Sequence, residues 1–130
     1  MKALTSCVVG ALLTGLMLPC TPGYSQPVSN HSANSILPGC RVVADWDPND
    51  PKVIRSQLFE AGFCAGIVDG LLGMAGGFNP QMRSCVPSEV NVQQAAKLVV
   101  QFLDLNPQAL HRDFRAVVVL VLRNTWPCKD

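Results

Sequence analysis

The chain of 130 residues carries 10 basic and 9 acidic side chains, and 48% of its residues are hydrophobic. This length suits a single domain. The near balance of charge excludes both the basic footprint of a nucleic-acid-binding protein and the charged, apolar-poor composition of a disordered chain.

The N-terminus, residues 1–25, has the layout of a secretory signal peptide. Lys2 provides a positive start, residues 3–18 form an apolar stretch, and small residues precede an expected cut after Ser25. The stretch is at the low edge of the roughly 17–25 residues that a membrane span needs. The sequence therefore predicts an exported protein. An uncleaved anchor is the main alternative, and a lipoprotein processed at Cys20 is a weaker one.

Cleavage would change both the charge and the cysteine count. Lys2 is the only charged residue removed, so nine basic and nine acidic residues remain. Four cysteines also remain, an even number that favours two disulfides in an exported protein, in any of three pairings. A zinc site is disfavoured because zinc-binding cysteines usually occur in close pairs, whereas these lie at least twenty residues apart: Cys40, Cys64, Cys85 and Cys128.

The segment that follows the signal peptide, residues 26–35, is polar and is expected to be a flexible lead-in with an exposed His31. A short helix or turn is expected around Cys40. The next segment, ADWDPNDP at residues 44–51, imitates the start of a calcium-binding loop. It lacks the glycine and the glutamate that such a loop requires at its sixth and twelfth positions. We therefore expect no metal site, and interpret Asp50-Pro51 as a helix start.

Three helices are expected beyond this loop. The first covers residues 51–75 and ends at Gly76-Gly77. The second begins at Asn91 and Gln94, which have the spacing of a capping box, and has apolar residues at helical spacing up to Asn106-Pro107.

The last helix is expected from Phe114 to Thr125, with Asp113 as its cap and Pro127 beyond its end. Its segment VVVLVL is β-prone by composition, but the flanking sequence favours a buried helix. No period-two strand pattern occurs elsewhere. The fold class expected is all-α, a small four-helix bundle-like domain braced by two disulfides.

Glycines recur at every fourth position of the first long helix, at Gly62, Gly66 and Gly70. Three explanations compete. A phosphate-binding loop is excluded because the glycines lie within a helix and no Gly-Lys-Ser/Thr follows. A membrane span is disfavoured by Glu60 and Asp69, since a central carboxylate costs roughly 2.5–3.5 kcal/mol on insertion scales. We therefore expect a helix-packing ridge, against which a neighbouring backbone comes close.

The sequence offers no catalytic constellation. Beyond the signal peptide the only histidines are His31 and His111, and an exported protein is not expected to keep the free thiol that a Cys-His pair requires. Asp69 is a carboxylate inside an apolar helix beside Gly70, either paired with an arginine or exposed at a recognition surface. Trp46 and Trp126 are either core anchors or interface anchors, which the sequence cannot separate, and the core is the default interpretation.

Three segments, in this order, resemble the Tai-type immunity protein family. FCAGIVDG at residues 63–70 is similar to the family signature F-C-x-G-Y-I-x-G. SCVPSEVNVQQAAKLVVQFLDLNPQALH at residues 84–111 is similar to its C-x-P, its capped Gln-containing helix and its Pro…Leu-His run, and LVLRNTWPC at residues 120–128 to its closing [FW]-P-C. Two positions depart from the pattern: Ile67 replaces a tyrosine, and Gln93 replaces a glycine.

Tai-type immunity proteins are periplasmic and neutralise peptidoglycan amidases delivered by type VI secretion. The resemblance implies an immunity-like helical domain over residues 36–130, in the periplasm, that binds a protein such as an amidase and can act as a homodimer. We expect no enzyme activity, no cofactor, no nucleic-acid partner and no stable membrane span after signal cleavage.

Partner contacts are expected in the loops at residues 44–51 and 78–86, because loops between rigid helices often carry binding residues. The candidates are Asp69, Phe78, Asn79, Gln81 and Arg83. In an up-down bundle, the start of the third helix and the end of the fourth lie at one end. This topology favours the pairing Cys85–Cys128 and leaves Cys40–Cys64 by elimination.

Two other functions stay open. One is a small helical periplasmic stress chaperone, which would expose apolar surface in acid and suppress aggregation. The other is an orphan interaction domain of an envelope complex. An enzyme is a more distant alternative, and would require hydrolytic activity that depends on His111 or Asp69.

Overall fold

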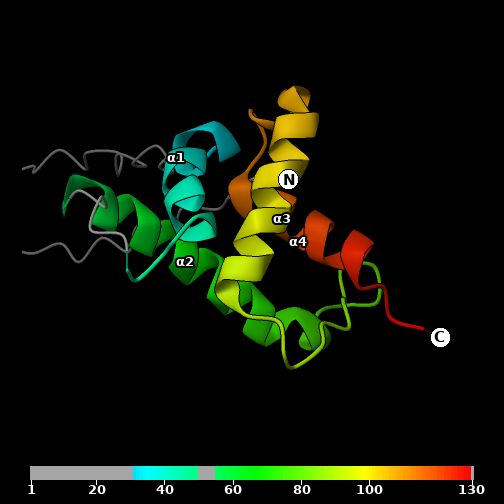
Figure 1. Ribbon diagram of the computed structural model, residues 1–130. Coiled ribbons are helices and arrows are strands. Elements are labelled where there is room, and N and C mark those ends of the chain that lie inside the picture. Colours follow the sequence, from blue (N-terminus) through cyan, green and yellow to red (C-terminus); the bar gives the residue numbers. More distant parts are fainter. Residues whose placement is uncertain (1–30, 50–54, 130) are drawn as a thin grey trace, which may run out of the picture.

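The computed structural model describes residues 31–49 and 55–129. The expected signal peptide, residues 26–30 of the lead-in and the helix start at Asp50-Pro51 lie outside the described residues. The described part contains four α-helices and two short 3-10 helices (Figure 1): α1 (Ala33–Ala44), α2 (Arg55–Met74), η1 (Ala75–Gly77), α3 (Val92–Leu105), η2 (Pro107–Ala109) and α4 (Phe114–Thr125).

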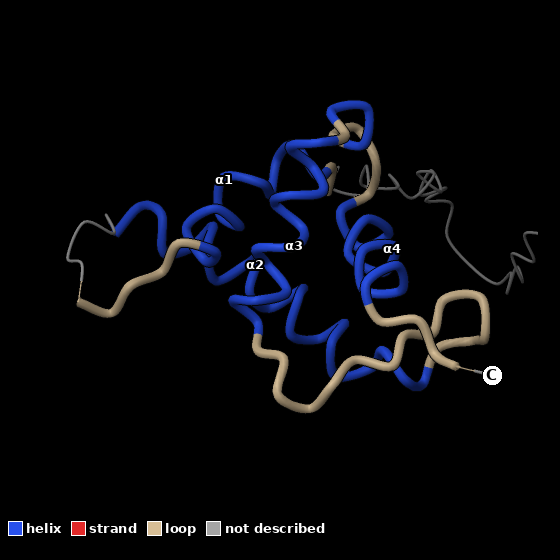
Figure 2. Tube along the Cα trace, turned by 45° about the vertical axis from the view of Figure 1, so that its right-hand side comes forward, coloured by secondary structure: helices blue, strands red, loops and turns tan. Residues whose placement is uncertain are grey.

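The expected all-α fold class is confirmed. Within residues 31–49 and 55–129 no strand occurs, and the sole β-type pairing is an isolated bridge between Ser32 and Asp113 (Figure 2). The β-prone run VVVLVL lies inside α4, as its flanking residues indicated. Burial explains why this run is helical, because Val117, Val118 and Val121 lie on one side of α4 and are all buried there.

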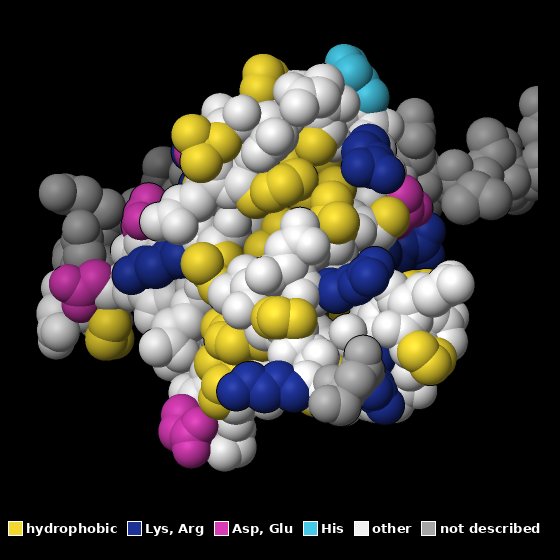
Figure 3. Space-filling model, turned by 90° about the vertical axis from the view of Figure 1, so that its right-hand side faces the viewer, with side chains coloured by type: hydrophobic (Ala, Val, Ile, Leu, Met, Phe, Trp, Pro, Cys, Tyr) yellow, Lys and Arg dark blue, Asp and Glu magenta, His cyan; other side chains and the backbone are white. Residues whose placement is uncertain are grey.

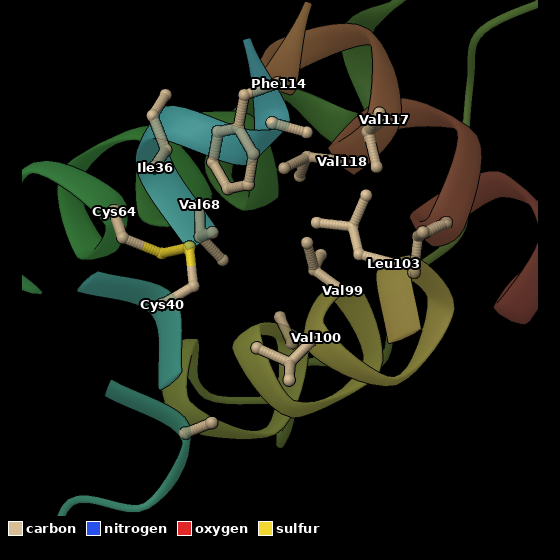
Figure 4. Packing of buried hydrophobic residues seen from close by; sticks show 14 of the residues in the cluster. Ile36, Cys40, Cys64, Val68, Val99, Val100, Leu103, Phe114, Val117 and Val118 are labelled. Atoms are coloured by element: carbon tan, nitrogen blue, oxygen red, sulfur yellow. A yellow bond between two sulfur atoms is a disulfide. The ribbon is translucent and has the colours of Figure 1, made fainter. Parts of the chain in front are cut away.

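The helices enclose one apolar core. α1 packs mainly against α2 and α3, while α4 contacts α2, α3 and, to a smaller extent, α1. In Figure 4 the side chains of Ile36, Val68, Leu103 and Phe114, one from each helix, converge in this core. Phe114 is the largest side chain that is fully buried.

Residues 33–35 of the expected flexible lead-in are helical, because α1 begins at Ala33. Ala33 is fully buried, and its backbone N–H donates to the carbonyl of Arg112. His31 is partly buried rather than exposed, and its ring lies 5.3 Å from that of Phe63. Its carbonyl accepts from the N–H of Phe114. These contacts with the start of α4 hold the segment in place.

The predicted caps of α3 and α4 are both present. Asn91 and Gln94 form the reciprocal capping box of α3, with N···O distances of 2.9 and 3.0 Å. The carboxylate of Asp113 accepts from the backbone N–H of Arg115 at 2.9 Å and so caps α4. These caps satisfy backbone donors that a helix leaves unpaired at its start.

The two favoured disulfides are also present. Cys40–Cys64 joins α1 to α2 inside the core, and Cys85–Cys128 joins the segment before α3 to the segment after α4. The N–H of Cys85 donates to the carbonyl of Trp126 at 2.9 Å, so the second cross-link and a hydrogen bond hold the same two segments together.

Candidate protein-binding surface

The glycine ridge of α2 packs against no other part of residues 31–49 and 55–129, which corrects the sequence interpretation. A Cβ atom built at Gly62, Gly66 or Gly70 would meet nothing within 4 Å, and all three residues are exposed. Cys64 lies 200° around the helix from Gly62 at about 100° per residue, on the opposite, buried face. The close helix contact is made by Gly39 of α1 instead.

The exposed side of α2 carries unusually large apolar side chains. Phe59 is 81% exposed, and Leu58, Phe63 and Met74 are between 40% and 56% exposed. A helix that is apolar on all sides is normally buried on all sides, yet α2 covers the core with one face only. We define the exposed face of α2 as its exposed residues: Leu58, Phe59, Glu60, Gly62, Phe63, Gly66, Asp69, Gly70, Gly73 and Met74.

An apolar groove borders this face, where the end of α1 and the start of α3 meet α2. It has a volume of about 410 Å³ and is lined by Val43, Trp46, Leu58, Ala61, Gly62, Ala65, Val92 and Gln93. Trp46 is 43% exposed and lines this groove, so its default assignment to the core is wrong. Trp126 does pack against the core.

Gln93 shapes the groove from α3. Its side-chain amide nitrogen donates to the carbonyl of Trp46 at 2.8 Å and to that of Ala44 at 3.2 Å. These bonds satisfy the last carbonyl of α1 and that of Trp46 just beyond it, and they hold the backbone of Trp46 beside α3. Gln93 is one of the two positions at which the sequence departs from the Tai-type pattern. A glycine at this position could not make these hydrogen bonds.

Sequence reasoning did not identify the groove. Its lining comes from three helices, and Val43, Ala61 and Ala65 give no signal of their own. One signal was present: α2 has large apolar residues on more than one side, whereas a surface helix normally buries a single apolar face.

The length and composition of α2 also bear on the membrane alternative. The segment Gln57–Gly77 is long and apolar enough to cross a membrane. Its most apolar stretch has a mean hydropathy of 1.5, and 22% of that stretch is buried in the domain. Glu60 and Asp69 are exposed on it, and Cys64 ties it to α1. A helix held by the core on one side and carrying charge on the other fits a protein-facing surface better than a lipid-facing one.

The predicted contact residues of the loop at 78–86 lie close together. Asn79 organises a turn: its side-chain oxygen accepts from the N–H of Gln81 at 3.0 Å, and its carbonyl accepts from the N–H groups of Met82 and Arg83, both at 2.9 Å. Asn79 and Gln81 are exposed, while Phe78 and Arg83 are partly buried.

Asp69 belongs to a different part of the surface. It is exposed on α2 between Gly66 and Gly70, and no ion pair or hydrogen bond joins it to another described side chain. The structure therefore separates the candidates into two groups, the exposed face of α2 and the loop. His111 is exposed, and among the described residues no three His, Cys, Asp or Glu side chains gather as metal ligands.

Comparison with known proteins identifies the family. No curated protein and no solved structure matches the chain. A model described as Rap1a immunity proteins matches residues 32–128, which is the described domain from the start of α1 to the Cys85–Cys128 disulfide. That match covers well over half of the chain, and so this helical, disulfide-braced protein belongs to the Rap1a immunity protein family.

Proposed function

We propose that this protein is exported to the periplasm and protects the cell by binding and inhibiting a type VI effector, a peptidoglycan amidase of the kind neutralised by Tai-type proteins. The family match over residues 32–128 carries the immunity role. The resemblance of residues 63–70 and 120–128 to Tai-type motifs favours an amidase as the target. In this role the protein acts by occlusion and carries out no chemistry.

Two features of the molecule support a binding role in the periplasm. Disulfides form and persist in oxidising compartments, and Cys40–Cys64 and Cys85–Cys128 both cross-link separate segments. Large apolar side chains exposed next to a groove mark protein-binding sites. We assign the main contact to the groove and the exposed face of α2, where glycines allow a partner backbone to approach closely.

The loop at 78–86 supplies the second contact in this proposal. Its turn is held by Asn79, and the N–H of Ser84 donates to the carbonyl of Ala75 at 3.1 Å. A loop ordered before binding loses little entropy when it enters an enzyme cleft. We expect this loop to block the amidase cleft while the α2 surface supplies most of the buried area.

Competition between sister cells tests the function. A host strain that lacks this gene is mixed with its secretion-competent parent, and we expect the deletion strain to be killed. The gene supplied in full restores survival, and the same gene without residues 1–25 does not if protection takes place in the periplasm. Cleaved peptide stems in the peptidoglycan of dying cells would identify an amidase. Equal survival of the deletion strain would contradict the immunity role.

A pair of variants tests the assigned surface in the same assay. Ala65→Arg places a charged side chain in the groove, and Gln101→Arg places the same side chain on an exposed position of α3. We expect Ala65→Arg to lose protection with the fold intact, and Gln101→Arg to keep it. Full protection by Ala65→Arg would remove the groove from the proposal.

A further inference from the structure

A polar cleft lies at the opposite end of α4 from its N-terminal cap. It has a volume of about 160 Å³ and is lined by Pro80, Arg83, Arg123, Pro127 and Cys128. Two of these five residues are arginines, and no acidic side chain is among them. This cleft is separate from the apolar groove, because the two share no lining residue.

The arginines of the cleft differ from others in the protein. Arg41 forms an ion pair with Asp104 and Arg115 with Asp113. Among the described residues neither Arg83 nor Arg123 has a carboxylate within ion-pair distance. The Nε atom of Arg83 is buried and has no hydrogen-bond acceptor in the described part of the chain. Buried donors normally have a partner, and a charged donor without one calls for an anion or another acceptor.

Arg83 is held in position from both sides. Its own N–H donates to Asn79, the next residue anchors to Ala75, and Cys85 is tied to Cys128 and to Trp126. Arg123 projects from the last turn of α4, where a positive charge also complements the helix dipole. Arg83 and Arg123 thus line one cleft from two different segments, which the Cys85–Cys128 disulfide joins. Such a site binds without first having to order its own backbone.

We propose that Arg83 and Arg123 form an oxyanion-binding site that accepts one carboxylate. The planar donors of arginine match a carboxylate and stay charged at any physiological pH. Figure 3 views the side of the molecule that carries the C-terminal end, and shows separate basic side chains around an apolar band. The carboxylate comes either from an acidic side chain of a bound protein or from a small free acid. The site does not depend on the immunity role.

The test uses the purified protein and the Nε–Hε resonances of its arginines in two-dimensional NMR. The probes are sodium acetate and two short capped peptides, Gly-Glu-Gly and Gly-Gln-Gly, at an ionic strength held constant with sodium chloride. We expect the Arg83 resonance, assigned with Arg83→Gln, to move in a saturable way with acetate or with the Glu peptide but not with the Gln peptide.

Two variants control the measurement. Arg123→Gln should weaken binding of the carboxylate probes about tenfold or more. Arg112 is an exposed arginine next to the other end of α4, and Arg112→Gln should leave the binding affinity unchanged. Similar affinities for acetate and the Glu peptide point to a small free acid, and clearly tighter binding of the Glu peptide points to a protein. The proposal is overturned if no probe gives a saturable shift, or if Arg123→Gln binds as the unaltered protein does.

Discussion

Gly39 of α1 lies against the backbone of Glu60 in α2. A Cβ atom at position 39 would be 2.2 Å from the Glu60 carbonyl oxygen and 3.0 Å from the N–H nitrogen of Ala61. No real Cβ atom sits that close to backbone, so the two helices can reach this separation only with glycine. One residue further along, Cys40 forms its disulfide with Cys64. The contact and the cross-link therefore hold the same pair of helices.

We predict that Gly39→Ala destabilises the protein strongly. The added methyl group must push α1 away from α2, and overpacking of this kind costs about 1–3 kcal/mol or more. Because the obstacle is backbone rather than a flexible side chain, the upper end of that range is expected. Urea unfolding followed by circular dichroism measures the change.

The matched control is Gly66→Ala on the exposed face of α2, where the added atom meets nothing. This variant should be as stable as the unaltered protein or more stable by up to about 1 kcal/mol, because alanine is the better helix former. If the two alanine variants were equally stable, the description of the α1–α2 contact would be wrong.

The two disulfides should differ in accessibility. Cys40 and Cys64 are both fully buried, whereas Cys85 is exposed and Cys128 is partly exposed. A mild reductant should therefore open Cys85–Cys128 first, as measured by alkylation at timed intervals and mass spectrometry. The loops closed are 43 and 24 residues long, so loss of either bond should cost about 3–4 kcal/mol. Alkylation of Cys40 and Cys64 before the other pair would contradict this order.

Gln93→Ala should loosen the wall of the apolar groove. The change removes the hydrogen bonds to the carbonyls of Ala44 and Trp46, and each such bond contributes about 1 kcal/mol. In a Trp126→Phe background, acrylamide should then quench Trp46 more strongly. Gln101→Ala, an exposed glutamine of the same helix, is the control and should leave quenching unchanged. An unchanged quenching constant in Gln93→Ala would show that Trp46 is held by other contacts.

The cap of α4 predicts a loss of stability in acid. The side-chain hydrogen bond from Arg115 is the main cause that lowers the pKa of Asp113 from 3.8 to about 2. A carboxylate with a depressed pKa stabilises the fold above its unfolded value, and this contribution disappears as pH falls from about 4 to about 2. Because the pair is exposed to solvent, the contribution is small and decreases with salt.

Two substitutions separate the charge of Asp113 from its role as a cap. Asp113→Asn keeps a capping oxygen but has no charge to titrate, so its stability should not show the decrease that belongs to Asp113 between pH 4 and pH 2. Asp113→Ala also loses the cap and should be less stable at neutral pH by about 1 kcal/mol. Thermal unfolding at several pH values measures both effects. An acid transition in Asp113→Asn equal to that of the unaltered protein would assign the pH dependence to other groups.

The sequence alone determined the all-α class, α3 with its capping box, and α4 with its cap at Asp113. These features depend on local hydrogen bonds and on apolar residues at helical spacing, and both involve residues that are close together in the sequence. The disulfide pairing followed from bundle topology, since Cys85 and Cys128 come to one end of the bundle.

Only the tertiary structure decided what each face of a helix meets. The repeated glycines of α2 indicate close packing, but spacing cannot say whether the neighbour belongs to the same chain, and here the ridge is exposed. Gly39, a single glycine with no pattern around it, makes the close contact instead. The apolar groove and the pairing of Arg83 with Arg123 in one cleft likewise join residues far apart in the chain. Such contacts arise from the packing of whole helices, and no local pattern encodes them.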